Sequence, residues 1–337
     1  MKLFLSIALS FCIACFTFGQ TEEELCKSGA DKATNKDFKG AVIDFSKAID
    51  LNSKSTYAYY NRGISYFNMQ EFQSAINDFT KVIELDATDK QAYFNRGIIR
   101  LAMRDYDGAI ADLQKTTQLD ASNAAAFYNL GVARKSKGDY NGALNDLNKA
   151  VSLDSYNTKA YNDRGIVKGI LKDYLGAIGD FNQAIKIDPD YSFAYYNRGV
   201  AKKDLKDFKG AIEDYSKAIE LDPDYVDTYY KRGVAKGSLE DYNGAVADYT
   251  KVIELNPAHA EAYFARAWAR NKLSDFEGAI ADYTKATELK PDNAYAFYNM
   301  ALIKFSLGNK ESACADLEKA KALGFAEAET LMEQKCK

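Results

Sequence analysis

The chain has 337 residues, of which 47% are hydrophobic and 27% are charged, a composition typical of folded proteins rather than disordered ones. Its formal net charge is -4, and an acidic balance argues against a nucleic-acid partner. The chain contains one histidine, His259, which excludes most histidine-based catalysis and metal binding.

Residues 1–19 have the pattern of a secretory signal peptide. Lys2 precedes an almost wholly apolar stretch over residues 3–18, and a cleavage site is expected near Gly19. The sequence therefore predicts an exported protein, either secreted or held in the periplasm or cell envelope. Two alternatives remain open: the segment stays as an uncleaved anchor, or Cys15 is lipidated and associates the protein with a membrane. No later stretch is long and apolar enough to cross a bilayer.

After residue 19 the sequence repeats every 34 residues. Ala returns nine times at this interval from Ala41 to Ala313, and Asp returns nine times from Asp44 to Asp316. The period has no break, so no interdomain linker is expected. The sequence predicts nine tandem repeats over residues 22–327, and a capping helix over residues 328–337. The repeats are expected at residues 22–55, 56–89, 90–123, 124–157, 158–191, 192–225, 226–259, 260–293 and 294–327.

Each repeat has the pattern of two helices, here called A and B. In residues 192–225, Tyr195 and Gly199 share one face of the A helix. Asp207 is a suitable N-cap for the B helix, which is expected to end before Pro223. One helix pair cannot bury its apolar face alone, but stacking against the next pair can. The fold class predicted is therefore an all-α superhelical solenoid of nine helix-turn-helix repeats.

This pattern closely resembles the tetratricopeptide repeat (TPR) family. The resemblance lies in a large residue early in helix A, a Gly or Ala four places later, and an Ala in helix B, as in Tyr195, Gly199 and Ala211. The family resemblance implies a right-handed superhelix whose concave groove is lined by A helices. It also implies a protein or peptide partner rather than a small-molecule substrate.

The A helices depart from the family pattern at two basic positions, and two interpretations remain open for them. The cations could form a ladder for an acidic ligand, or they could pair internally with the Asp44 series. The internal pairing is favoured, because every repeat keeps at least one cation for its aspartate and a semi-buried carboxylate needs such a partner. The cations are Lys32, Arg62, Arg96, Arg100, Arg134, Arg164, Lys168, Arg198, Lys202, Arg232, Lys236, Arg266, Arg270 and Lys304.

The resemblance also implies which side chains line the groove. The asparagines could bind the backbone of an extended peptide, because an amide offers one acceptor and two donors. The aromatic residues beside them would supply buried area. Alternatively, these residues recur only because the repeats were duplicated. The candidates are Tyr60, Asn61, Phe94, Asn95, Tyr128, Asn129, Tyr196, Asn197, Tyr230, Phe264, Trp268, Tyr298 and Asn299.

Three cysteines follow the leader. Cys314 and Cys336 lie at equal distances from Phe325, beside a turn at Gly324. A helical hairpin folded there would bring the two opposite each other, so a disulfide is predicted. Cys26 would remain as a buried thiol or as a partner in a bond between chains.

No catalytic, metal-binding or cofactor-binding constellation is found in the sequence. The glycines follow the 34-residue period rather than a phosphate-binding loop, and His259 is interpreted as a solvated turn residue. The predicted function is an exported, non-enzymatic scaffold that binds a partner protein or an extended peptide, without cofactors. The alternatives are a structural spacer or assembly factor in a cell-envelope complex and, with less support, an enzyme or an enzyme's accessory subunit.

Overall fold

A computed structural model describes residues 20–337. These residues form two compact units, and the boundary along the chain lies between Lys137 and Gly138. The predicted signal peptide, Cys15 and the predicted cleavage site near Gly19 lie outside the described residues. The 34-residue period runs through the division without an insertion, so the sequence contains no signal for it. The expectation that no interdomain linker interrupts the repeats stays a prediction.

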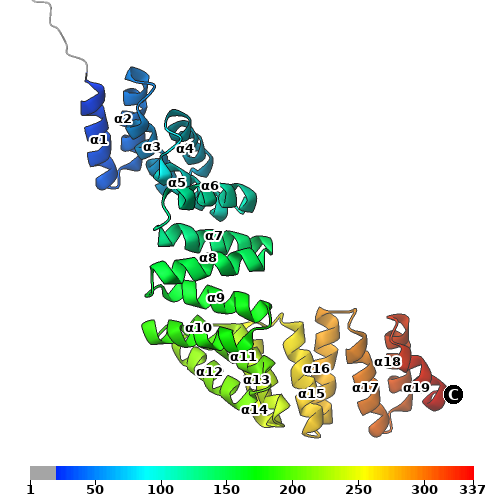
Figure 1. The fold of residues 1–337 in the computed structure, drawn as a ribbon. Helices are drawn as coiled ribbons and strands as arrows, with labels where there is room; N and C mark the ends of the chain where they lie inside the picture. Colours follow the sequence, from blue (N-terminus) through cyan, green and yellow to red (C-terminus); the bar gives the residue numbers. More distant parts are fainter. Residues whose placement is uncertain (1–19) are drawn as a thin grey trace, which may run out of the picture. The chain divides into compact units, whose positions relative to one another are not determined.

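Within each unit, A and B helices alternate and pack against their neighbours in the sequence, and the described residues contain no strand (Figure 1). Unit 1 holds α1 (Glu22–Thr34), α2 (Phe38–Leu51), α3 (Thr56–Asn68), α4 (Phe72–Leu85), α5 (Lys90–Ala102), α6 (Tyr106–Leu119) and α7 (Ala124–Lys137). The odd-numbered helices are A helices and the even-numbered helices are B helices.

Unit 2 continues the same alternation and ends with one extra helix. It holds α8 (Tyr140–Leu153), α9 (Thr158–Ile170), α10 (Tyr174–Ile187), α11 (Ser192–Asp204), α12 (Phe208–Leu221), α13 (Val226–Ser238), α14 (Tyr242–Leu255), α15 (Ala260–Lys272), α16 (Phe276–Leu289), α17 (Ala294–Ser306), α18 (Lys310–Ala322) and α19 (Ala326–Lys335). The capping helix begins at Ala326, two residues earlier than the expected range of 328–337, because the turn at Gly324 and Phe325 is short.

Aspartates begin most B helices, as the sequence predicts. The Asp241 side chain accepts a hydrogen bond from the Gly244 amide, and a Cβ at Gly244 would lie 2.1 Å from the Asp241 Oδ2 atom. Glycine at this third helical position therefore makes room for the cap. Where Ser74 and Ser312 stand at this position, the N-cap residues Glu71 and Asn309 make no side-chain cap bond.

The core of each repeat forms where its A and B helices cross. Gly199 lies against Tyr215, and a Cβ at Gly199 would be 2.8 Å from the Tyr215 Cε1 atom. Both Tyr215 and the neighbouring Ala211 are fully buried. The small residue is therefore required for the close approach of the two helices.

Candidate peptide-binding surface

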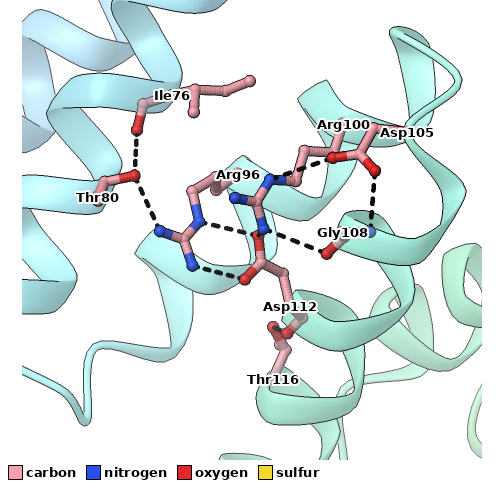
Figure 2. A network of polar contacts seen from close by, with 8 residues as sticks. All are labelled: Ile76, Thr80, Arg96, Arg100, Asp105, Gly108, Asp112 and Thr116. Atoms are coloured by element: carbon pink, nitrogen blue, oxygen red, sulfur yellow. Dashed lines mark hydrogen bonds and ion pairs between the residues drawn. The ribbon is translucent and has the colours of Figure 1, made fainter.

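In six of the A helices an arginine belongs to an internal network, which Figure 2 shows for Arg96. Its Nε and Nη2 atoms donate to the two carboxylate oxygens of Asp112 in the following B helix, at 2.9 and 2.7 Å. Its Nη1 atom donates to the Thr80 hydroxyl of the preceding B helix at 2.9 Å. One guanidinium therefore connects α5 to both α4 and α6, and so links two successive repeats.

The same arrangement recurs in both units. An A-helix arginine makes two bonds to its own repeat's aspartate and one bond to a Ser, Thr or Asn of the preceding B helix. The arginines that do so, besides Arg96, are Arg62, Arg164, Arg198, Arg232 and Arg266. The network is therefore a repeating structural element rather than a local contact.

The electrostatics of the pairs favour the charged state of the arginine. Burial raises the pKa of the Asp78 carboxyl above its ordinary value, and the hydrogen bonds from Arg62 act in the opposite direction. The hydrogen bond to Asp78 raises the pKa of the Arg62 guanidinium. The guanidinium also lies 5.5 Å from the ring centroid of Tyr59 in its own helix. A bidentate pair of this kind is ionised at neutral pH.

The second cation of the A helix reaches the same aspartates. Arg100 donates to Asp112 at 2.7 Å, and Lys202 lies 2.8 Å from Asp214. Where the first cation is absent, Lys32 pairs with Asp44 and Lys304 pairs with Asp316. These cations are engaged by the chain's own carboxylates, so the structure supports the internal pairing over a ladder for an acidic ligand.

Four of the aromatic residues predicted for the groove pack against the B helices of their own repeats: Tyr60, Tyr196, Tyr230 and Phe264. The ring centroids of Tyr60 and Phe79 are 5.6 Å apart, and those of Phe264 and Tyr283 are 5.4 Å apart. The Tyr196 hydroxyl donates to Asp227 of the next A helix. Burial, followed by this bond, raises the pKa of Tyr196. These rings thus stabilise the repeats, and only their remaining exposed edges can contact a partner.

Four of the predicted asparagines use one amide hydrogen within the chain. Asn61 and Asn129 donate to backbone carbonyls of their own helices, at 2.8 Å each. Asn95 donates to the Tyr60 hydroxyl at 2.9 Å, and Asn197 donates to the Asn162 side-chain oxygen at 3.0 Å. These bonds orient the amides. They also leave each side-chain oxygen as an acceptor, the role that a peptide N–H requires.

Pockets form between neighbouring A helices at equivalent positions in the two units. In unit 1, a pocket of about 250 Å³ between α3 and α5 is lined by Ile64, Phe67, Phe94, Asn95 and Ile98. In unit 2, one of about 290 Å³ between α9 and α11 is lined by Ile166, Ile170, Asn197, Val200 and Asp204.

A third pocket, of about 610 Å³, lies between α13 and α15 in unit 2. It is lined by predicted groove residues, among them Tyr230, Phe264 and Trp268. Of the thirteen candidates, six therefore line these pockets: Phe94, Asn95, Asn197, Tyr230, Phe264 and Trp268. Tyr60, Asn61, Tyr128, Asn129, Tyr196, Tyr298 and Asn299 are half-buried.

The aliphatic residues that form the pocket walls were not among the predicted groove residues. Ile64, Ile166 and Val234 each follow the small residue of an A helix, and Ile98 and Val200 occupy the same position one repeat later. Their signal was present in the sequence, since this position is apolar from Ile64 to Leu302. An apolar periodic residue looks like core, and only the packing shows that it borders a pocket.

The interpretation of His259 as a solvated turn residue was wrong. His259 is the N-cap of α15, and its Nδ1 atom accepts from the Ala262 amide at 3.2 Å. Its ring also stacks on Tyr230 with a centroid separation of 5.3 Å. A neutral imidazole nitrogen can accept a hydrogen bond, and so it replaces the Asp or Asn that caps other A helices.

The structure joins Cys314 of α18 to Cys336, the residue after α19, by a disulfide. Ala328 is buried against the last repeat, with Phe325, Leu331 and Met332 packed around it. The bond therefore attaches the capping helix to the last repeat. Cys26 is a free, buried thiol, and burial raises its pKa.

Among residues 20–337, no group of three or more His, Cys, Asp or Glu side chains is arranged to hold a metal ion. Over the same residues, no helix has the length and apolarity needed to span a membrane.

Comparisons with solved structures support the fold. The crystal structure of YrrB, described as a TPR protein with an unusual peptide-binding site, is 27% identical, with a TM-score of 0.50 over 55% of this chain and 95% of YrrB. A TPR protein from Parabacteroides merdae is 20% identical, with a TM-score of 0.54 over 74% of this chain and 99% of its own. The C-terminal part of a TPR protein from Cytophaga hutchinsonii is 19% identical, with a TM-score of 0.60 over 71% and 98%. No curated protein matches the sequence.

Family models described as tetratricopeptide repeat or TPR repeat match residues 56–89, 94–158, 192–225, 226–259, 248–281, 268–308 and 294–323. These matches cover well over half of the chain, and all of them lie within the helical repeats described above. The chain belongs to the tetratricopeptide repeat family, whose fold supports a role as a protein-interaction scaffold.

Proposed function

We propose that this protein is an exported, non-enzymatic scaffold that holds an extended segment of a partner protein against its A helices. The observation that supports the proposal best is the recurrence of apolar pockets between neighbouring A helices, at the same register in both units. Recurring pockets suit a ligand that is itself extended and periodic.

The chemistry of the pockets fits an extended peptide. Aliphatic walls such as Ile98 and Val200 can take apolar side chains, and burying apolar area drives association. The side-chain oxygens of Asn95 and Asn197 can accept backbone N–H groups beside these walls. The likeness to YrrB, a TPR protein with a peptide-binding site, adds support for this class of ligand.

Export is proposed from two independent features. The first is the signal-like leader over residues 1–19. The second is the Cys314–Cys336 disulfide, because such bonds persist mainly in oxidising compartments. The test is to fuse the leader to a reporter enzyme that is active only after export. Reporter activity that is the same without the leader would contradict the proposal.

A charge placed in a pocket tests the binding surface. Val200→Lys puts an ammonium into the wall of the α9–α11 pocket, and Ala247→Lys adds the same charge on the exposed face of α14, outside the pockets. Random peptides displayed on phage are selected on the mature protein and then measured against both variants. We expect Val200→Lys to weaken a subset of the selected peptides at least about tenfold, while Ala247→Lys leaves them unchanged.

The result also separates the scaffold from a rigid spacer. A spacer with no groove ligand would select no peptide, or would select peptides that both variants bind equally. A thermal melt of each variant shows that the fold is retained, so that loss of binding is not mistaken for unfolding.

A further inference from the structure

The pocket between α13 and α15 differs from the other two in its lining. Five aromatic side chains border it: Tyr230, Tyr242, Tyr249, Phe264 and Trp268. Trp268 is the one tryptophan of the chain, and it stands where the first repeat has Ala30 and the other repeats have Ile, Val or Leu. The sequence departs from its own period at this place, which an ordinary core position would not require.

Two small residues line this pocket. Gly237 and Ala265 occupy the register positions of Phe67 and Asn95 in the α3–α5 pocket. In that pocket the chain's own Phe67 ring occupies part of the space, and the volume is about 250 Å³. The α13–α15 pocket has no such ring at Gly237, and its volume is about 610 Å³.

Trp268 forms a wall of the pocket instead of filling it. Its ring meets Tyr242 edge to face, with centroids 5.5 Å apart, and a Cβ at Gly237 would lie 3.2 Å from the Trp268 Cζ3 atom. The indole thus lies against the backbone of α13 and remains 36% exposed. Exposed indole surface of this kind is costly in water, and a stacked ring would cover it.

The rim of the pocket carries two charges of opposite sign. Glu240 and Lys272 both line the pocket, and the Lys272 ammonium lies 5.9 Å from the Trp268 ring centroid. A cationic side chain of the ligand would be repelled by Lys272, and an anionic one would be repelled by Glu240. An uncharged ring meets neither repulsion and gains contact with the surrounding aromatic residues.

We propose that the α13–α15 pocket takes an aromatic side chain of the bound segment and so determines which segments this scaffold selects. The inference rests on the proposed function and names the side-chain class for one of its pockets. Phe67 of unit 1 is the internal counterpart of this ligand side chain. At its register the chain supplies a ring to the α3–α5 pocket, whereas the α13–α15 pocket has Gly237.

The emission of Trp268 gives a direct test on the mature full-length protein. The probes are N-acetyl-L-phenylalaninamide, N-acetyl-L-leucinamide and N-acetyl-L-lysinamide. We expect the phenylalanine amide to shift the emission at a concentration about threefold to tenfold lower than the other two, the factor that aromatic pairing adds. Equal midpoints for the three amides, or a lower midpoint for the lysine amide, would overturn the proposal.

A matched pair of variants locates the response. Gly237→Phe places a ring at the register of Phe67 and should abolish the response to the phenylalanine amide. Gly169→Phe makes the same change at the same register of α9, where an added Cβ has nothing within 4 Å, and should leave the response unchanged. Gly237→Ala is the milder variant if Gly237→Phe does not fold, and it should raise the midpoint at least about twofold by crowding Trp268. An unchanged midpoint in both folded Gly237 variants contradicts the proposal.

Phage selection distinguishes failure of this inference from failure of the proposed function. Selected peptides that are sensitive to Val200→Lys but not enriched in aromatic residues, and unaffected by Gly237→Phe, overturn the inference alone. If no peptide is selected at all, the proposed function fails and the assigned role of the pocket fails with it.

Discussion

Two junctions between successive repeats of unit 2 differ at the position of the first A-helix cation. At α14–α15, Arg266 donates to the Thr250 hydroxyl of the preceding repeat at 3.0 Å and binds Asp282 with two bonds. At α16–α17, Met300 stands in place of the arginine and is 4% exposed. There the Thr284 hydroxyl lies 3.4 Å from the Met300 sulfur and donates to the Ile280 carbonyl.

The difference separates two roles of the cations. Each aspartate needs one cation, and Lys304 meets that need for Asp316 where the arginine is absent. The arginine adds a polar link between repeats, which the second cation of the helix does not make. Most repeats therefore have two cations that can pair with the aspartate, whereas the hydrogen bond to the preceding B helix depends on the arginine alone.

The largest effect is expected when the aspartate itself is removed. Asp214 is 3% exposed and faces both Arg198 and Lys202, so Asp214→Ala would leave two partly buried cations without their partner. We expect the free energy of unfolding to fall by roughly 3 to 5 kcal/mol, measured by urea denaturation. A loss below about 0.5 kcal/mol would show that the pairs are only a surface feature.

The capping helix should depend on its disulfide nearly as strongly. Cys336→Ser opens a loop of sequence separation 22 next to the junction that lacks an arginine. The free energy of unfolding is expected to fall by about 3 kcal/mol. Adding a reductant to the wild type should reproduce the shift and should not affect the variant. Mass spectrometry of the unreduced mature protein should find Cys314 and Cys336 in one linked peptide, and finding both as free thiols would refute the bond.

Exchanging the junction residues tests the link between repeats. Arg266→Met copies the α16–α17 junction into α14–α15 and leaves Arg270 to pair with Asp282, so a loss of about 2 kcal/mol is expected. Met300→Arg offers a guanidinium to Asp316 and Thr284 and should add about 1 kcal/mol. Urea melts of both variants give the comparison. Equal stability of Arg266→Met and wild type would mean that the link contributes nothing.

The smallest effect is expected at the buried hydroxyl of Tyr283. Within the described residues this hydroxyl has no hydrogen-bond partner, and some other repeats have a phenylalanine at the equivalent position, as at Phe79 and Phe181. Tyr283→Phe should therefore raise the free energy of unfolding by about 1 kcal/mol. A lower stability of the variant would contradict this account of the hydroxyl.

The same substitution should change the response to alkali. Burial raises the pKa of Tyr283 above the ordinary value of about 10, so the unfolded chain loses the proton first. The contribution of the Tyr283 hydroxyl group to the free energy of unfolding is fully present below about pH 10 and is lost as the pH rises above this value. The stability of Tyr283→Phe should therefore fall less steeply than that of the wild type as the pH rises above about 10. Unfolding at alkaline pH is followed by circular dichroism. Tyr249→Phe is a useful comparison, because burial also raises the pKa of Tyr249.

Much of this protein is determined by its sequence, because the information is local and repeated. The spacing of Ala41, Asp44 and their equivalents defines helix pairs, and Asp207 and its equivalents begin the B helices. The pairing of cations with the aspartates also follows from the sequence, since each repeat keeps both partners at a fixed separation. The approach of Cys314 to Cys336 follows from a short hairpin, whose geometry is likewise local.

Only the tertiary structure decides what depends on neighbouring repeats. The third bond of Arg96 reaches Thr80, the walls of the α3–α5 pocket come from two A helices, and His259 caps a helix while stacking on Tyr230. The division after Lys137 likewise follows from packing. A periodic sequence predicts the structure of one repeat. Contacts between repeats depend on side-chain shape and burial, which only the packed structure defines.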